Sequence, residues 1–159
     1  MKNRVKRIAQ VGMIVENADL AMQMYEKYFG ISGWEPFDMN TIPVDLLIDG
    51  KPGKLNIRGA IAQTPNGVEL ELIEPVGEGV FMDHLREHGP GVHHFAVIMP
   101  NKNEDFHDLM EEIQADGNKP WVHARMPEPE GDGPRMDFAY LDLRRDMGSI
   151  IEVYNEPRE

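Results

Sequence analysis

Four polar side chains stand inside apolar, β-rich stretches of the sequence, where a charged group buried alone would be costly. They are Gln10, Glu71, His94 and Glu152. A divalent cation would remove that cost, because two carboxylates, one imidazole and one amide oxygen form a ligand set with a net charge of −2. Such a set suits Zn, Co, Ni, Mn or Mg in an open coordination geometry. The four residue types therefore predict a metal site.

The strands that carry these residues place them on one face. Successive side chains of a strand point to opposite faces. In residues 8–17, Gln10 lies opposite the apolar face, and His94 does the same in residues 92–101. Of the two adjacent histidines, His94 is therefore predicted to face the site, whereas His93 falls with the apolar face and caps its edge.

The alternation also has a simpler interpretation. Glu69, Glu71 and Glu152 would face water on a half-exposed antiparallel sheet, and His94 would be a hydrogen-bonded structural histidine. The residue pattern alone leaves this alternative open beside the metal site.

The other histidines and three arginines receive different predictions. Histidines beside acidic residues on predicted helices are expected to be solvated: His84, His88 and His107. His123 can line the pocket without binding metal. Three arginines could receive an anionic substrate group, although a solvated surface position is the simpler expectation for each: Arg58, Arg125 and Arg135.

The elements that must position the candidate ligands occur twice in the same order. A strand over residues 8–17 is followed by a helix over 18–30, and a strand over 92–101 is followed by a helix over 104–117. Apolar residues recur at helical spacing in both helices, and a glycine ends each one. A tryptophan segment and a terminal strand follow in both halves, so the sequence predicts a duplicated βαβββ module.

The candidate ligands follow the same duplication. Gln10 and Glu71 are 61 residues apart, and His94 and Glu152 are 58 residues apart. Corresponding residues of the two modules would then meet about a pseudo-twofold axis. We expect one α+β domain over residues 1–159, made of two modules and a short amphipathic linker helix, at about residues 6–76, 91–157 and 77–90.

Two segments receive no predicted element. Residues 36–57 are rich in turn residues. Residues 126–136 mix proline, glycine and acidic residues, and we expect them to form a loop that could cover a site.

Composition excludes several classes of protein. The 28 acidic and 16 basic residues give a net charge of −12, which would repel nucleic acids and anionic membrane surfaces. The chain has no cysteine, so it has no disulfide framework or thiolate nucleophile, which fits a cytoplasmic protein. No stretch reaches the roughly 18 apolar residues that a membrane helix needs, and we identify no targeting segment because Gln10 and Glu16 interrupt the apolar start.

Several segments resemble, in order and spacing, those of the vicinal oxygen chelate superfamily of glyoxalases, bleomycin-resistance proteins and dioxygenases. The likeness is strongest to methylmalonyl-CoA epimerase-like members and lies in AQVGMIVENADLAMQMYEKYFGI, VELELIEPVGEG, HGPGVHHFAV and GSIIEVYNEP. The resemblance implies paired βαβββ modules that form a cupped mixed sheet around one metal ion. It also implies that His94, Glu71 and Glu152 are ligands and that the protein is a homodimer.

The sequence departs from the epimerase pattern at two places. Gln10 stands where these epimerases usually have histidine, and the order Gln, Glu, His, Glu is similar to that of zinc-type glyoxalase I. The segment LNIRGAIAQ has no carboxylate, although the matching epimerase strand supplies a catalytic glutamate. Glyoxalase I also fits imperfectly, because Ile14 stands where that family has an arginine.

The resemblance implies removal of a proton next to a carbonyl, with a divalent ion (Zn, Co, Ni or Mn) holding the enolate oxygens and Glu152 or Glu71 shuttling the proton. We therefore expect a metal-dependent isomerase that epimerises an acyl-CoA thioester such as methylmalonyl-CoA. The alternatives are a lactoylglutathione lyase acting on a glutathione hemithioacetal and a non-catalytic binding protein of the bleomycin-resistance type. An extradiol dioxygenase would need two histidines and one carboxylate around iron, which Gln10 disfavours.

Overall fold

The computed structural model describes residues 3–126 and 136–155. Its helices and strands confirm the predicted α+β class. The chain divides into two compact units. The first unit contains residues 9–42 and 55–94, and the second unit contains residues 1–8, 43–54 and 95–159.

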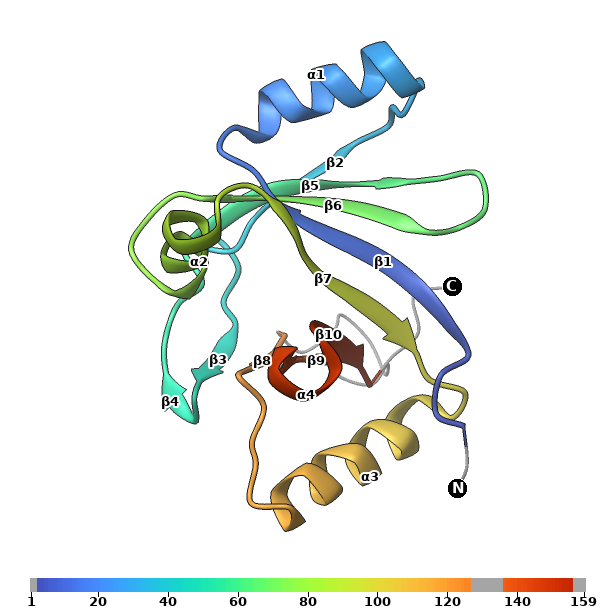
Figure 1. Cartoon of the computed structure of the whole chain (residues 1–159), viewed down its shortest axis with the longest axis vertical. Helices are drawn as coiled ribbons and strands as arrows, with labels where there is room; N and C mark the ends of the chain where they lie inside the picture. Colours follow the sequence, from blue (N-terminus) through green and yellow to red (C-terminus); the bar gives the residue numbers. More distant parts are fainter. Residues whose placement is uncertain (1–2, 127–135, 156–159) are drawn as a thin grey trace. The chain divides into compact units, whose positions relative to one another are not determined.

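The first unit is built on four strands in the order β2-β5-β6-β1. Its elements are β1 (Arg7–Ile14), α1 (Ala18–Phe29), β2 (Glu35–Asp38), β5 (Ile57–Gln63), β6 (Glu69–Pro75) and α2 (Val80–His88), and β7 (Gly91–Ile98) begins in it. β1 pairs with β6 in parallel, whereas β5 pairs with β2 and β6 in antiparallel fashion. α1 packs along β5 and β6, as Figure 1 shows.

Helix α1 begins and ends as the sequence predicts. The Asn17 side chain accepts a hydrogen bond from the backbone N–H of Leu20 at 2.8 Å, which satisfies a donor at the helix start. Gly30 follows the last turn with a φ of 69°, a left-handed conformation that costs glycine little. These two caps fix the residues at which α1 begins and ends.

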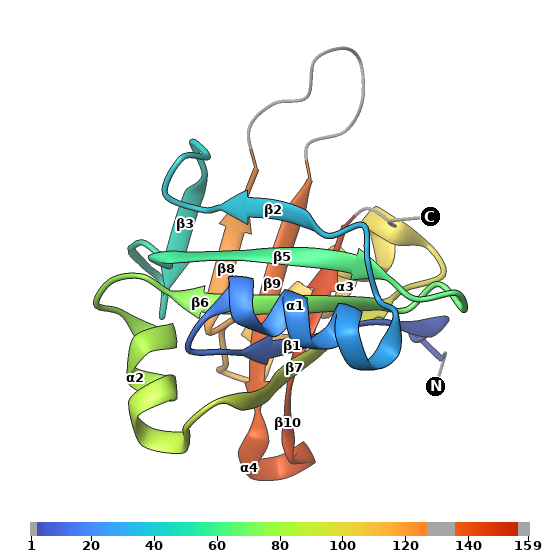
Figure 2. The ribbon, with the colours of Figure 1, turned by 90° about the horizontal axis from the view of Figure 1, so that it is seen from above.

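The second unit contains β10, β9, β8, β3 and β4, which are hydrogen-bonded in that order, and the last residues of β7. Its elements are β3 (Asp45–Ile48), β4 (Lys51–Pro52), α3 (Lys102–Ala115), β8 (Val122–Arg125), β9 (Asp137–Leu143), α4 (Arg144–Met147) and β10 (Ser149–Tyr154). β8 and β9 run side by side (Figure 2). Helix α4 is a single turn between β9 and β10 that the sequence pattern did not predict.

The two unassigned segments have different outcomes. Residues 36–57 contain β2 in the first unit and β3 and β4 in the second, where β3 pairs with β8. Within the expected loop over 126–136, residues 127–135 lie outside the described part of the chain. No helix in the described residues is long and apolar enough to cross a membrane.

One face of the second unit's sheet packs against α3. A buried cluster joins the two: Val97, Met99, Phe106, Ala139, Leu141 and Val153. Val153 and the partly buried Ile151 lie on this face of β10, so Glu152 points to the opposite face. The helix layer therefore fixes which way the candidate ligand on β10 points.

Replacing Phe106 by alanine should lower the free energy of unfolding by about 3–5 kcal/mol, because a large aromatic side chain would leave a cavity in this cluster. Phe106 is 1% exposed. Met147 provides the control, since it is a large apolar residue that is 64% exposed and its replacement should change stability by less than about 0.5 kcal/mol. Urea unfolding measures both, and equal effects of the two substitutions would contradict the described core.

Candidate metal centre

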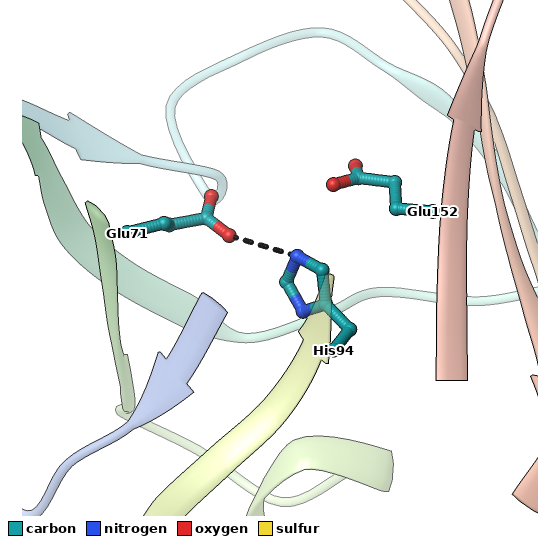
Figure 3. Close-up of side chains that lie close together, drawn as sticks. All are labelled: Glu71, His94 and Glu152. Carbon is teal, nitrogen blue, oxygen red and sulfur yellow. Dashed lines mark ion pairs between the residues drawn. The ribbon is translucent and has the colours of Figure 1, made fainter. Parts of the chain in front are cut away.

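The first unit brings three of the four predicted ligands together. The Nε2 atom of His94 lies 3.2 Å from Oε1 of Gln10 and 3.3 Å from Oε2 of Glu71. Figure 3 shows the Glu71–His94 ion pair as a dashed line. Gln10 and His94 are each 1% exposed, and the Glu71 side chain is 12% exposed. Two oxygens and one nitrogen thus converge away from bulk solvent.

Strand pairing accounts for this convergence. In the parallel β1–β6 pair, Gln10 lies opposite Glu69 and Gly12 lies opposite Glu71. Residues two apart on a strand share a face. Gln10 and Gly12 therefore share one face of β1, and His94 from β7 lies against it.

Gly12 makes room for the imidazole. A Cβ atom at this position would overlap the ring atoms of His94. No larger residue fits without moving the ring, so the close approach of His94 to β1 depends on a glycine here.

The separations around His94 Nε2 are compatible with a divalent ion. Zinc binds nitrogen and oxygen ligands at about 2.0–2.2 Å, which places neighbouring ligand atoms about 2.8–3.6 Å apart in octahedral to tetrahedral geometry. The separations of 3.2 and 3.3 Å around His94 Nε2 fall within this range. An imidazole, a carboxylate and an amide oxygen are also ligand types that such ions accept.

His93 and His94 are in contact through their rings. Their Nδ1 atoms lie 3.1 Å apart, so one donates a hydrogen bond to the other. If His94 donates, its Nε2 presents a lone pair to a metal ion. His93 is itself held in place, because its ring packs against those of Phe81 and His84 with centroid distances of 4.9 and 4.7 Å.

Glu69 is buried and contacts the candidate site, although the sequence pattern did not predict it as a site residue. Its side chain accepts hydrogen bonds from Nε2 of Gln10 at 3.0 Å and from Nε2 of Gln63 at 2.7 Å. Alternation was the available signal, because Glu69 is two residues from Glu71 and shares its face.

The fourth predicted ligand, Glu152, belongs to β10 of the second unit and is labelled in Figure 3. It is 4% exposed, and the hydroxyl group of Tyr154 donates a hydrogen bond to its Oε2 at 2.6 Å. Glu69 is 8% exposed. The alternative in which these carboxylates face water is therefore wrong for Glu69 and Glu152.

His123 on β8 lies on the opposite face of the second unit's sheet from Glu152 on β10. It lies opposite Ala139, a residue of the face that packs on α3, and its Nε2 is 3.5 Å from Asp137. It lines a cavity of about 210 Å³ with Asp45, Leu46, Leu47 and Arg125.

The arginines considered for substrate binding have acidic neighbours. Arg58 donates hydrogen bonds to Glu74, which raise the pKa of Arg58 above its ordinary value, and a contact with Asp19 adds to this. Arg125 contacts Asp137 at 3.4 Å. Arg135 lies outside the described residues.

The surface histidines of α2 and α3 are at least partly accessible. His88 and His107 are exposed, whereas His84 is partly buried and packs its ring against His88 with a centroid distance of 4.5 Å. The expectation of simple solvation thus holds for two of the three, and His84 contributes to the packing around His93 instead.

Comparison with known families identifies the class. The sequence matches the family model described as the Glyoxalase/Bleomycin resistance protein/Dioxygenase superfamily over residues 9–140. The chain therefore belongs to this superfamily, which confirms the resemblance found in the sequence. A comparison with curated proteins gives no match.

Solved structures give the same fold. Methylmalonyl-CoA epimerase from Streptomyces coelicolor is 20% identical, with a TM-score of 0.64 and coverage of 94% of this chain and 96% of that one. The epimerase from Mycobacterium tuberculosis is 19% identical, with a TM-score of 0.60 and coverage of 97% and 90%. A hypothetical protein from Bacillus halodurans is 17% identical, with a TM-score of 0.60 and coverage of 96% of each chain. These likenesses establish a glyoxalase-like fold.

Proposed function

We propose that this chain is a divalent-metal-dependent enzyme that moves a proton next to a carbonyl group, and that it epimerises an acyl-CoA thioester such as methylmalonyl-CoA. The observation that carries the proposal is the convergence of Gln10 Oε1 and Glu71 Oε2 on His94 Nε2 in a buried setting. Structures of similar fold support the substrate class, since one is a methylmalonyl-CoA epimerase in complex with methylmalonyl-CoA.

Gln10, Glu71 and His94 would hold the ion, and we propose Glu152 as the fourth ligand. Its support is its place in the sequence repeat, where it corresponds to Glu71, and its burial as a carboxylate. Glu71, His94 and Glu152 each offer one ligand atom suited to a metal. When bound, an ion such as Zn, Co, Ni or Mn supplies a Lewis acid that lowers the energy of the negative charge developing on the substrate carbonyl oxygen.

Glu152 and Glu71 are also the proposed proton-transfer groups, and each would act when it has loosened from the ion. The β5 segment provides no carboxylate, so the base must come from elsewhere. Tyr154 donates to Oε2 of Glu152 and orients the carboxylate, and Oε1 is the atom we assign to accept the substrate proton. Epimerisation returns a proton to the opposite face of the carbon, and Glu71 is the group assigned to return it.

The test is solvent exchange at the α carbon of methylmalonyl-CoA, followed by proton NMR in deuterated water. Metal-loaded protein should introduce deuterium, and chelator-treated protein should not. Glu152→Gln preserves the size of the side chain and should slow exchange by about 10²–10⁴-fold. Absence of deuterium incorporation by metal-loaded wild-type protein would overturn the epimerase proposal.

A second candidate function is a glyoxalase I-like lyase. It is favoured by Gln10 in the first ligand position, because the order of the four ligand types is then similar to that of zinc-type glyoxalase I. Ile14 counts against it, since this fully buried apolar residue stands where a glutathione-binding arginine would be expected. Thioester formation from methylglyoxal and glutathione, followed by absorbance, separates the two activities.

We further propose that the protein is a cytoplasmic homodimer. The absence of cysteine supports the compartment. Exposed apolar side chains on α1 support self-association, with Leu20, Tyr28 and Phe29 being 54%, 66% and 74% exposed. Light scattering after size-exclusion chromatography measures the oligomeric state. Protein that stays metal-free after purification without chelator would instead favour a binding protein of the bleomycin-resistance type.

A further inference from the structure

The side-chain amide of Gln10 can present either of two chemically opposite ends to the site. Its oxygen can bind a cation, whereas its NH₂ group cannot. The two ends have nearly the same size, so packing alone does not select between them. Something must therefore fix the orientation if Gln10 is to act as a ligand.

Glu69 provides that selection. Its Oε2 atom lies 3.0 Å from Nε2 of Gln10 and accepts a hydrogen bond from it. A carboxylate oxygen accepts hydrogen bonds and has no hydrogen to donate, so the reversed amide would place two acceptors against each other. With the NH₂ group directed to Glu69, Oε1 of Gln10 lies 3.2 Å from His94 Nε2.

Glu69 is in turn held from the other side. Nε2 of Gln63 donates to Oε1 of Glu69 at 2.7 Å, so each carboxylate oxygen accepts one amide hydrogen bond. The strand registers place Glu69 opposite Gln10 on β1 and opposite Gln63 on β5. A line of three side chains across β5, β6 and β1 thus ends at the candidate metal position.

We propose that Glu69 is a positioning residue that makes Gln10 an oxygen ligand of the metal. This inference rests on the metal site of the proposed function. It assigns to Glu69 a role apart from proton transfer, because both of its oxygens are engaged by amide groups. It also explains how a glutamine can serve in the first ligand position, since an adjacent carboxylate selects its oxygen.

The decisive variants keep side-chain size and exchange hydrogen-bonding character. Glu69→Gln can pair with either orientation of Gln10, and we expect it to weaken zinc binding by about 10–100-fold, as loss of an outer partner of a ligand does. Gln10→Glu alone places two carboxylates against each other and should also bind poorly. The double variant Gln10→Glu/Glu69→Gln restores one donor and one acceptor and should bind zinc more tightly than either single variant.

Calorimetric titration with zinc measures the four affinities. Glu74→Gln is the matched control, because Glu74 is on the same strand but pairs with Arg58, and its replacement should leave zinc affinity unchanged. Wild-type affinity in Glu69→Gln, or no recovery in the double variant, would overturn the inference.

A second readout keeps the two proposals separate. In metal-free protein, the side-chain NH₂ signals of Gln10, identified by their loss in Gln10→Ala, should shift in Glu69→Gln and stay in place in Glu74→Gln. If wild-type protein binds no zinc, the proposed function fails. If the NH₂ signals of Gln10 do not shift in Glu69→Gln, Glu69 does not fix the orientation of this amide, whatever the zinc affinities are.

Discussion

Replacing His94 by alanine is expected to abolish zinc binding and to lower α-proton exchange by about a thousandfold or more. The imidazole is the proposed nitrogen ligand, and Gln10 Oε1 and Glu71 Oε2 converge on it, so its loss removes the centre of the group. Lewis-acid stabilisation by a metal ion contributes several kcal/mol to such a reaction, which corresponds to a rate factor of about 10³.

Metal content measured by elemental analysis, together with the exchange rate, checks this result. His107→Ala provides the control, because it removes an exposed imidazole from α3 and should change neither quantity. The free energy of unfolding should also be measured, to show that the variant is still folded when it loses the metal. His94→Ala removes the partner of the mostly buried Glu71 carboxylate and should lower this free energy by about 1–3 kcal/mol. A folded His94→Ala variant with full metal content would contradict the assigned site.

The candidate ligands could be predicted because their strands alternate clearly. Gln10 and His94 each occupy the polar position of an otherwise apolar run, and the structure places both in the same buried group. The repeat then paired Glu71 with Glu152, a correspondence that remains a prediction for a common site. Local pattern is sufficient here because side chains alternate between the two faces of a strand, so one polar residue in an apolar run marks the face on which it lies.

Partners across strands could not be predicted in the same way. Glu69 is assigned to Gln10 and Gln63 only once the parallel β1–β6 register and the antiparallel β5–β6 register are known. A single sequence gives alternation within a strand but not the register between strands. The contact of Tyr154 with Glu152 was also missed, although the two residues share a face of β10.

The strands within residues 36–57 were the ones that the sequence did not predict. The strands in this segment are short, and in β3 (Asp45–Ile48) the exposed Leu47 is as apolar as the buried Leu46, so the sequence shows no alternation of polar and apolar residues. Its stabilising partner is β8, more than 70 residues away in the chain, so no local signal marks it. The segment contributes strands to both compact units, whereas the predicted modules assign it wholly to the first half.

Gly12→Ala is the second substitution with a large expected effect, because it adds one methyl group where the His94 ring lies. The ring cannot move freely, since Gln10, Glu71 and His93 contact its nitrogen atoms. Overpacking of this kind costs about 1–3 kcal/mol, and displacement of the ring should weaken zinc binding by at least about a hundredfold. Thermal unfolding and zinc titration measure the two effects.

The double variant Gly12→Ala/His94→Ala distinguishes this overlap from a general defect in β1. Without the imidazole, the methyl group has room, and β1 is an ordinary strand in which alanine is accepted. Adding Gly12→Ala to His94→Ala should therefore cost no stability and could add about 0.4–1 kcal/mol, because alanine restricts the unfolded chain more than glycine does. Equal losses from Gly12→Ala in both backgrounds would mean that the His94 ring does not lie over this glycine, and the geometry assigned to the centre would then be wrong.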